Sequence, residues 1–239
     1  MIKIENVEIH GWEAALRGMR NPKNSWHLSD SFTTKIEDEE TLQVADFAFF
    51  MGDNDHKLAS ALAKGGPVHG KYKRMITVYL DITAPLYWWK EFDTYKVGTV
   101  ANSCSTMHKI HAKEFTIDDF SCEHLEDFDA IPWDSKALYE PEFAKTMECV
   151  IAMLNTARTL YLETKDTDKP LAKKYWWQMI QLLPSSYNQK RTVMLNYEVL
   201  TNIYESRRHH KLDEWHVVCD WIESLPYAEL IIGEKKEEK

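Results

Sequence analysis

The sequence predicts an α+β fold, because it contains one clear strand and many amphipathic helices. Residues 73–83 alternate, and Ile76, Val78, Leu80 and Ile82 share one side, which is typical of a strand. The second half of the chain instead repeats its apolar residues at helical spacing. Few strands and many helices together favour an α+β arrangement with a mainly helical C-terminal half.

Apolar residues at helical spacing predict the other secondary-structure elements. It predicts helices over residues 12–19, 38–51, 58–64, 86–95, 173–183, 191–206 and 212–225, and a long helix opened by Pro141. Pro85 suits the first turn of the helix that follows the strand. Residues 98–106 are small and polar, so we expect a loop there. We expect one domain over residues 1–232 and a charged, frayed tail over residues 233–239.

Composition narrows the classes of function. The chain has 239 residues, 44% of them apolar and 28% charged, which is typical of a folded domain. A net charge of −9 argues against binding of nucleic-acid polymers, which require a basic face, but allows a small basic pocket. No apolar stretch approaches the roughly 20 residues of a membrane helix, and the first residues lack a secretion signal.

Cysteines and histidines do not predict a metal site. The four cysteines contain no Cys-x-x-Cys pair, which favours a reduced, cytoplasmic compartment. Two clusters contain the side chains of a metal site, but their spacings match no common zinc pattern, and ordinary surface histidines explain both. These clusters are His108 and His111 near Cys104 and Cys122, and His209, Asp213 and His216 on one helix face.

Glycine-rich and nucleophilic motifs are equally sparse. The sequence contains no Gly-x-Gly-x-x-Gly and no Walker-type loop, so a Rossmann or P-loop nucleotide site is not expected. A reactive thiol in Ser103-Cys104-Ser105 would need a basic neighbour such as Lys96 or His108. A polar loop with a half-buried cysteine is the simpler interpretation.

Two segments of the chain can be compared with the motifs of one enzyme family. In the first segment, Ala84-Pro85-Leu86-Tyr87 resembles the family's entry from strand to helix, and Glu91 stands at a glutamine position. In the same segment, Thr94-Tyr95-Lys96 replaces Arg-His-Arg, and Thr99, Asn102, Cys104 and Thr106 fall at a Ser/Glu/Ser/Arg loop. The second segment fits better: Leu183-Pro184, Asn196, Leu200, Asn202 and Arg207 match in order and without gaps. Together, the two segments resemble the flavin-dependent thymidylate synthases.

The resemblance implies a ThyX-like fold with a small, mainly antiparallel sheet, and it implies roles for named residues. Arg207 would stabilise negative charge on a pyrimidine during catalysis. The flavin would contact His69, Tyr95, Lys96, Asn196 and Asn202. The nucleotide would contact Glu91, Thr99, Ser103, Cys104, Ser105 and Arg207. FAD, NADPH and a folate would serve C5 methyl or hydroxymethyl transfer to a dUMP-like nucleotide, in a homotetramer.

The departures from the family pattern concern cations. Family arginines for the flavin phosphates become Thr94 and Lys96, one for the nucleotide phosphate becomes Thr106, and a further one becomes Ile180. Each lost charged hydrogen bond removes on the order of 1.5–3 kcal/mol. Cations elsewhere could rebuild a phosphate site, and the candidates are Lys90, Lys96, Arg74 and Lys109.

Three hypotheses therefore remain for function. The first is a flavin-dependent transferase acting on a pyrimidine nucleotide. The second is an inactive protein of the same fold that binds, senses or sequesters a nucleotide or regulates a partner. The third is a helical interaction protein whose tryptophan pairs form an interface. For Trp88-Trp89 and Trp176-Trp177, packing in the core or between subunits is the favoured role over stacking on a ligand.

Overall fold

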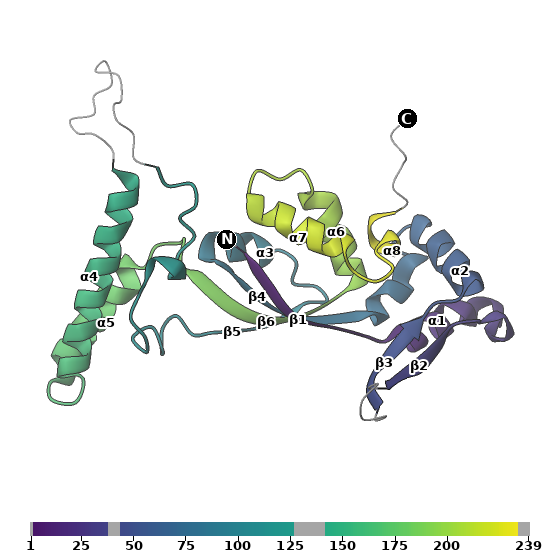
Figure 1. Cartoon of the computed structure of the whole chain (residues 1–239), viewed down its shortest axis with the longest axis horizontal. Helices are drawn as coiled ribbons and strands as arrows, with labels where there is room; N and C mark the ends of the chain where they lie inside the picture. Colours follow the sequence, from purple (N-terminus) through teal and green to yellow (C-terminus); the bar gives the residue numbers. More distant parts are fainter. Residues whose placement is uncertain (1, 38–43, 127–141, 234–239) are drawn as a thin grey trace, which may run out of the picture. The chain divides into compact units, whose positions relative to one another are not determined.

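The computed structural model describes residues 2–37, 44–126 and 142–233 (Figure 1). These residues form two compact units. Unit 1 contains residues 1–4, 82–94 and 102–191, and unit 2 contains residues 5–81, 95–101 and 192–239. The expectation of a single domain over residues 1–232 stays a prediction.

The strands form two sheets. The larger, mainly antiparallel sheet has the order β1-β4-β6-β5. Its strands are β1 (Lys3–His10), β4 (Thr77–Pro85), β5 (Val100–Ser103) and β6 (Asn188–Asn196). The smaller sheet pairs β2 (Phe32–Glu37) with β3 (Val44–Phe50) in antiparallel register, with Phe32 opposite Phe50.

Helices dominate the rest of the described chain, and the predicted α+β class is confirmed. The helices are α1 (Trp12–Arg20), α2 (Asp53–Lys64), α3 (Leu86–Phe92), α4 (Phe143–Thr164), α5 (Lys169–Leu182), α6 (Tyr197–Arg207), α7 (Asp213–Glu223) and α8 (Glu229–Ile232). Within the described residues, no helix is long and apolar enough to cross a membrane.

The predicted strand is confirmed as β4, with a later start. Val78, Leu80 and Ile82 are at most 2% exposed, so one side of the strand faces the core as its alternation predicts. Residues 70–75 form a 3-10 helix instead, in which Lys73 is buried and donates to Thr201 Oγ1 at 2.8 Å. Burial lowers the pKa of Lys73.

Pro85 is the last residue of β4 rather than the first of the helix, and α3 ends at Phe92 rather than at residue 95. The first free N–H groups of α3 donate to the segment after Leu183-Pro184: Leu86 N to Tyr187 O at 3.0 Å and Tyr87 N to Ser185 O at 2.9 Å. These bonds satisfy donors that a helix start leaves without intrahelical partners.

Three sequence predictions are wrong. The helix predicted over 38–51 is a strand over residues 44–50, and residues 38–43 lie outside the described residues. The helix predicted over 191–206 begins only at Tyr197, because residues 188–196 form β6. The loop predicted over 98–106 contains the short strand β5. The predicted helix start at Pro141 lies outside the described residues, and α4 begins at Phe143.

The core of unit 1 holds the first tryptophan pair. Trp88 and Trp89 are fully buried, and their ring centroids lie 4.9 Å apart. In Figure 1, α4 and α5 lie side by side, and together with loop residues they enclose a second apolar cluster. Its buried members are Ile110, Phe115, Phe120, Met147, Leu154, Ala157 and Met179. Trp176 packs against this cluster, whereas Trp177 is 42% exposed.

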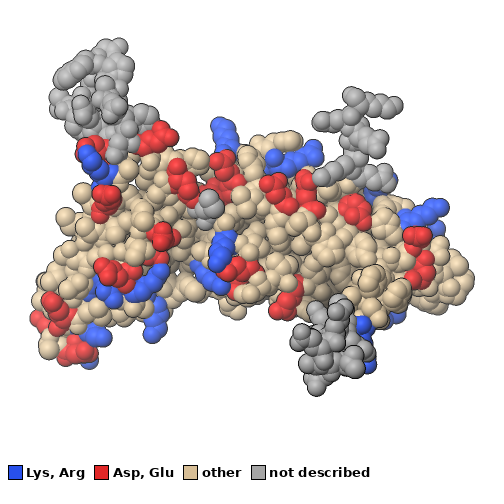
Figure 2. Space-filling model, in the orientation of Figure 1, with Lys and Arg blue, Asp and Glu red and all other residues tan. Residues whose placement is uncertain are grey.

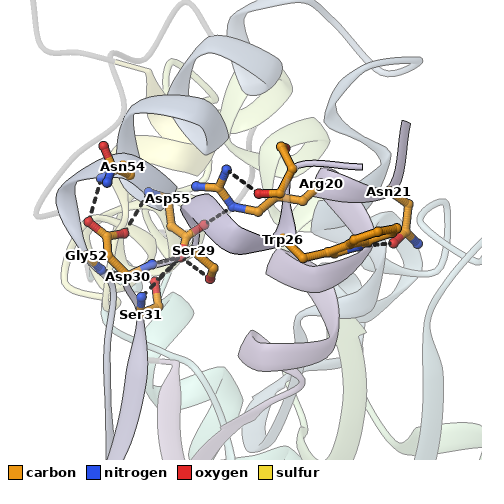
Figure 3. Close-up of polar contacts among 10 residues, drawn as sticks. Arg20, Asn21, Trp26, Ser29, Asp30, Ser31, Gly52, Asn54 and Asp55 are labelled. Carbon is orange, nitrogen blue, oxygen red and sulfur yellow. Dashed lines mark hydrogen bonds and ion pairs between the residues drawn. The ribbon is translucent and has the colours of Figure 1, made fainter. Parts of the chain in front are cut away.

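The core of unit 2 combines an aromatic cluster with a buried ion pair. Trp12 stacks on Phe49 at 5.3 Å and meets Tyr197 and Tyr227 edge-on. Beside it, Arg20 of α1 is 3% exposed and Asp55 of α2 is fully buried. Arg20 Nε donates to Asp55 Oδ1 at 2.6 Å (Figure 3).

Candidate functional site

Arg207 lies in a cation–aromatic cluster within unit 2. It is the last residue of α6, and its Nε donates to Tyr95 Oη at 2.9 Å. Its guanidinium carbon lies 4.8 Å from the ring centroid of Trp215 and 5.7 Å from that of Tyr95. Contacts of this kind attract a cation to the ring face. The hydrogen bond and the ring contacts therefore restrict the position of the Arg207 guanidinium.

Local sequence explains why the helix that carries Arg207 is well fixed. Asn196 caps α6, because its Oδ1 accepts from Glu198 N at 3.1 Å and from Val199 N at 3.0 Å. Tyr197 is fully buried and donates its hydroxyl to Pro226 O at 2.6 Å. At the other end, the charge of Arg207 is favourable beside the C-terminal carbonyls of the helix.

The flavin residues implied by the resemblance all lie in unit 2, but they differ from one another in how far their side chains are exposed. His69, Lys96 and Asn202 are exposed. Asn196 is 9% exposed and engaged as the cap of α6. Asn202 and Arg207 are five residues apart on α6, which separates them by about 140° around the helix axis. The two side chains therefore do not start from one face of the helix.

The nucleotide residues implied by the resemblance divide between the units. Thr99 belongs to unit 2, where its Oγ1 is buried and has no hydrogen-bond partner among the described residues. Glu91 is half-buried on α3 of unit 1. Ser103 and Cys104 are also in unit 1 and are exposed, and Cys104 N donates to Lys190 O at 2.9 Å.

Ser105 has a structural role in the same loop of unit 1. Its Oγ accepts from Met107 N at 3.2 Å and from His108 N at 2.9 Å, which closes a turn. The main chain of this loop is also held from β6, since Gln189 Nε2 donates to Cys104 O at 2.7 Å. The loop therefore has a defined backbone that presents an exposed thiol at Cys104.

Sequence reasoning missed a second arginine cluster, which lies within unit 1. The Arg191 guanidinium lies 4.1 Å from the ring centroid of Trp89 and pairs with Asp93 Oδ1 at 2.8 Å. Arg191 Nε also donates to Gln189 Oε1 at 3.0 Å. Recognising β6 as a strand would have identified Arg191 and Gln189 as neighbours on one side of it, since strand residues two apart share a face.

Neither histidine cluster forms a metal centre in the part of the chain that the structure describes, where no three metal-binding side chains converge. His216 Nε2 instead lies 2.7 Å from the main-chain oxygen of His210. His108 is exposed in the loop that Ser105 closes.

The donor set fits a flavin poorly. Asn196 is occupied as a helix cap, and Arg74, a candidate for replacing a lost phosphate cation, is paired with Glu198 through both of its nitrogen contacts. Thr94, at one lost arginine, donates its hydroxyl to Glu91 O at 2.8 Å. Among the other described candidates, Lys90 and Lys109 are exposed in unit 1, so Lys96 is the one exposed lysine in unit 2 with the residues assigned to the flavin. A single lysine is a weak counterpart for a diphosphate.

Comparison with solved structures identifies which known fold this chain resembles. No protein-family model and no curated protein matches the chain by sequence. Among solved structures, Thymidylate Synthase X (ThyX) from Helicobacter pylori, crystallised with FAD and dUMP, is 15% identical, with a TM-score of 0.60 and 96% of each chain covered. The UMP/dUMP methylase PolB from Streptomyces cacaoi, bound with 5-Br dUMP, is 14% identical, with a TM-score of 0.53, covering 93% of this chain and 88% of its own. This chain therefore has a ThyX-like fold.

Proposed function

We propose that this protein binds a pyrimidine nucleotide of the dUMP type and that Arg207 contacts its base. The observation that carries the proposal is the fixed guanidinium of Arg207, held by the Tyr95 hydroxyl and by the ring of Trp215. A guanidinium whose position is already restricted can meet the carbonyl edge of a planar ring with little further loss of side-chain entropy. The ligands bound in the similar structures, dUMP and 5-Br dUMP, support the same ligand class.

The chemistry that Arg207 offers is electrostatic. A permanent cation beside a pyrimidine carbonyl stabilises negative charge on the ring, and such charge develops when a nucleophile adds to it. The carbonyl oxygen needs only a donor and a positive potential, both of which a guanidinium provides. The exposed Asn202 and the buried Thr99 hydroxyl are further proposed contacts of the nucleotide.

The test compares two adjacent arginines. Arg208 follows Arg207 directly, carries the same charge and is exposed, so Arg208→Ala is a matched control for Arg207→Ala. Wild-type protein at dUMP concentrations of about 100 times Kd gains roughly 2.7 kcal/mol, or about 5–10 °C in Tm. We expect Arg207→Ala to lose this shift and Arg208→Ala to keep it. Full dUMP affinity in calorimetric titration of Arg207→Ala would refute the assignment.

A second candidate function is flavin-dependent C5 methyl or hydroxymethyl transfer to the same nucleotide. It is favoured by one observation: the match to a synthase crystallised with FAD and dUMP extends over 96% of both chains. FAD would supply redox chemistry when bound, with NADPH as reductant and a folate as carbon donor. A homotetramer in the cytoplasm belongs to this proposal. The departures at Thr94 and Thr106 and the engaged Asn196 favour binding without turnover instead.

Flavin content separates the two candidates. Mass spectrometry of small molecules released from purified protein, with an absorbance spectrum, detects FAD directly. Bound FAD and consumption of NADPH in the presence of dUMP support the transferase. Colourless protein whose Tm rises with dUMP but not with FAD supports the nucleotide-binding proposal alone.

A further inference from the structure

A basic hollow lies between the C-terminal end of α4 and the N-terminal part of α5, within unit 1. It has a volume of about 350 Å³. The described residues that line it are Tyr161, Lys165, Lys169, Ala172, Lys173 and Trp176. Three of these six are cations and two are aromatic, and none is a carboxylate. We name these six residues the lysine hollow.

The charge of the lysine hollow departs from that of the chain, whose net charge is −9. On the face drawn in Figure 2, leaving the grey residues aside, Lys and Arg are scattered among Asp and Glu rather than gathered into one broad basic surface. Within the described residues, no ion pair neutralises Lys165, Lys169 or Lys173. Lys169 and Lys173 are also four residues apart on α5, a spacing at which like charges repel.

A neighbouring histidine reports the same positive potential. The ring of His111 lies 4.7 Å from that of Tyr161, which lines the hollow. The pKa of His111 is lowered by its burial and then by the charges of Lys165, Lys109 and Arg158. A second proton on this imidazole is disfavoured by its burial and by the neighbouring cations, and the field of those cations attracts an anion.

The aromatic wall of the hollow is rigid. Trp176 Nε1 donates to Met107 O at 2.9 Å, and its ring meets that of Trp177 edge-on at 4.8 Å. Trp176 also packs against the apolar cluster of unit 1. Its indole is thereby held in place beside three flexible lysines, which combines a surface for a ring with charges for a phosphate.

We propose that the lysine hollow binds a ligand that joins a phosphate group to an aromatic ring, with the phosphate on Lys165, Lys169 and Lys173 and the ring against Trp176. The site differs from the one proposed for dUMP, because all its residues belong to the α4–α5 hairpin of unit 1. Its size is close to that of small-ligand pockets, roughly 300–1,000 Å³.

Calorimetric titration with three probes tests the ligand class. Adenosine diphosphate carries both the ring and the phosphates, pyrophosphate carries the charge alone, and adenosine carries the ring alone. We expect adenosine diphosphate to bind most tightly, and we expect its affinity to fall as KCl is raised, because salt screens exposed charges. Absence of adenosine diphosphate binding, or equal affinity for adenosine, would overturn the proposal.

A matched pair of lysines on α5 tests the location. Lys173 and Lys174 are adjacent and exposed, but only Lys173 lines the hollow. Lys173→Gln should weaken adenosine diphosphate binding roughly fivefold and Lys174→Gln by less than twofold. Equal effects would place the ligand elsewhere. Both variants should keep the rise in Tm with dUMP that Arg207→Ala loses, so this result is separable from failure of the proposed function.

The fluorescence of Trp176 gives a second readout. Adenosine diphosphate should change tryptophan emission in wild type and in Trp177→Phe, because Trp177 does not line the hollow. The change should vanish in Trp176→Phe. A change that persists in Trp176→Phe contradicts stacking on this ring.

Discussion

Asp55 is the acceptor at the centre of a buried polar cluster, and its removal should destabilise unit 2. The carboxylate is fully buried on α2 and faces the buried Arg20 of α1 (Figure 3). It also accepts four hydrogen bonds through Oδ2, from Ser29 Oγ at 2.7 Å, Asp30 N at 3.2 Å, Ser31 N at 3.1 Å and Ser31 Oγ at 2.7 Å. Asp55 therefore joins the start of α2 to the end of α1 and to the segment before β2.

The expected cost of Asp55→Ala follows from what it leaves behind. Arg20 stays buried without its counter-ion, and removing one partner of a buried pair costs about 3–5 kcal/mol. Arg20 already has one guanidinium nitrogen, Nη2, that finds no partner among the described residues, so relief within the cluster is limited. A loss of this size lowers Tm by on the order of 10 °C in a chain of this length.

The assay compares Asp55→Ala with Asp53→Ala in thermal unfolding and hydrogen exchange. Asp53 lies in the same first turn of α2 but is exposed, so its loss removes only a helix-dipole interaction of about 0.3–1 kcal/mol. Exchange should accelerate in peptides from α1 and α2 of Asp55→Ala, whereas peptides from α4 and α5 serve as an internal reference. Adding Arg20→Leu to Asp55→Ala should recover part of the loss, because the uncompensated charge is then removed.

Lowering the pH tests the same contribution of Asp55 to stability without a mutation, because acid protonates its carboxylate. Burial acts to raise the pKa of Asp55, but hydrogen bonds from Ser29, Ser31 and Arg20 outweigh it, and the pKa lies below its ordinary value of 3.8. The carboxylate therefore stabilises the fold fully above pH 4 or so and loses this contribution as the pH falls through the lowered pKa.

Equal Tm values for Asp55→Ala and Asp53→Ala at neutral pH would refute the reasoning.

Three further predictions concern positions in or near the candidate sites. Gly98→Ala should cost about 1–3 kcal/mol in urea unfolding, because φ is +80° and the new Cβ would lie 2.9 Å from Asn196 Nδ2; Gly66→Ala, with φ +82° and open space, should cost less. Asn196→Ala should cost about 1 kcal/mol by removing the cap of α6, whereas Asn196→Asp should retain it. In native protein, iodoacetamide should modify the exposed Cys104 and Cys149 but spare Cys219, since burial raises the pKa of its thiol to about 11; rapid modification of Cys219, measured by peptide mass, would contradict its burial.

Two of the errors in the sequence prediction, over residues 191–206 and 38–51, have a common cause. Residues 193, 197, 200 and 203 are apolar at helical spacing, so one periodic pattern runs across the boundary between β6 and α6. The competing signal is the short alternation in which Val193 and Leu195 are buried and Thr192 is exposed. In residues 38–51 the helical spacing of Leu42, Ala45 and Phe49 likewise outweighed the strand preference of valine and phenylalanine.

Local sequence patterns do not predict contacts between residues that are far apart in the chain. The pairing of Phe50 with Phe32 defines β3, and nothing within a window of helical length reveals it. Tyr95 and Arg207 are 112 residues apart, and Arg20 and Asp55 are 35 apart. The resemblance supplied Arg207 and Tyr95 as separate site residues, but it contained no information on Trp215, whose ring faces the guanidinium.

Retention of the fold and retention of the site are separate questions in this chain. The residues that hold the fold are buried apolar ones, such as Leu80, Trp89 and Leu200, and they tolerate wide sequence change when volume and pattern are kept. Thr94 and Lys96, which stand where the family pattern has arginines, are exposed, so a different residue at either position costs little stability. A ThyX-like fold at 15% identity therefore supports flavin chemistry through the fold alone and not through the residues that would hold the flavin. Binding of dUMP that is lost in Arg207→Ala and kept in Arg208→Ala would be evidence from the residues themselves. Both variants lose one positive charge, but only Arg207→Ala removes a residue of the proposed site.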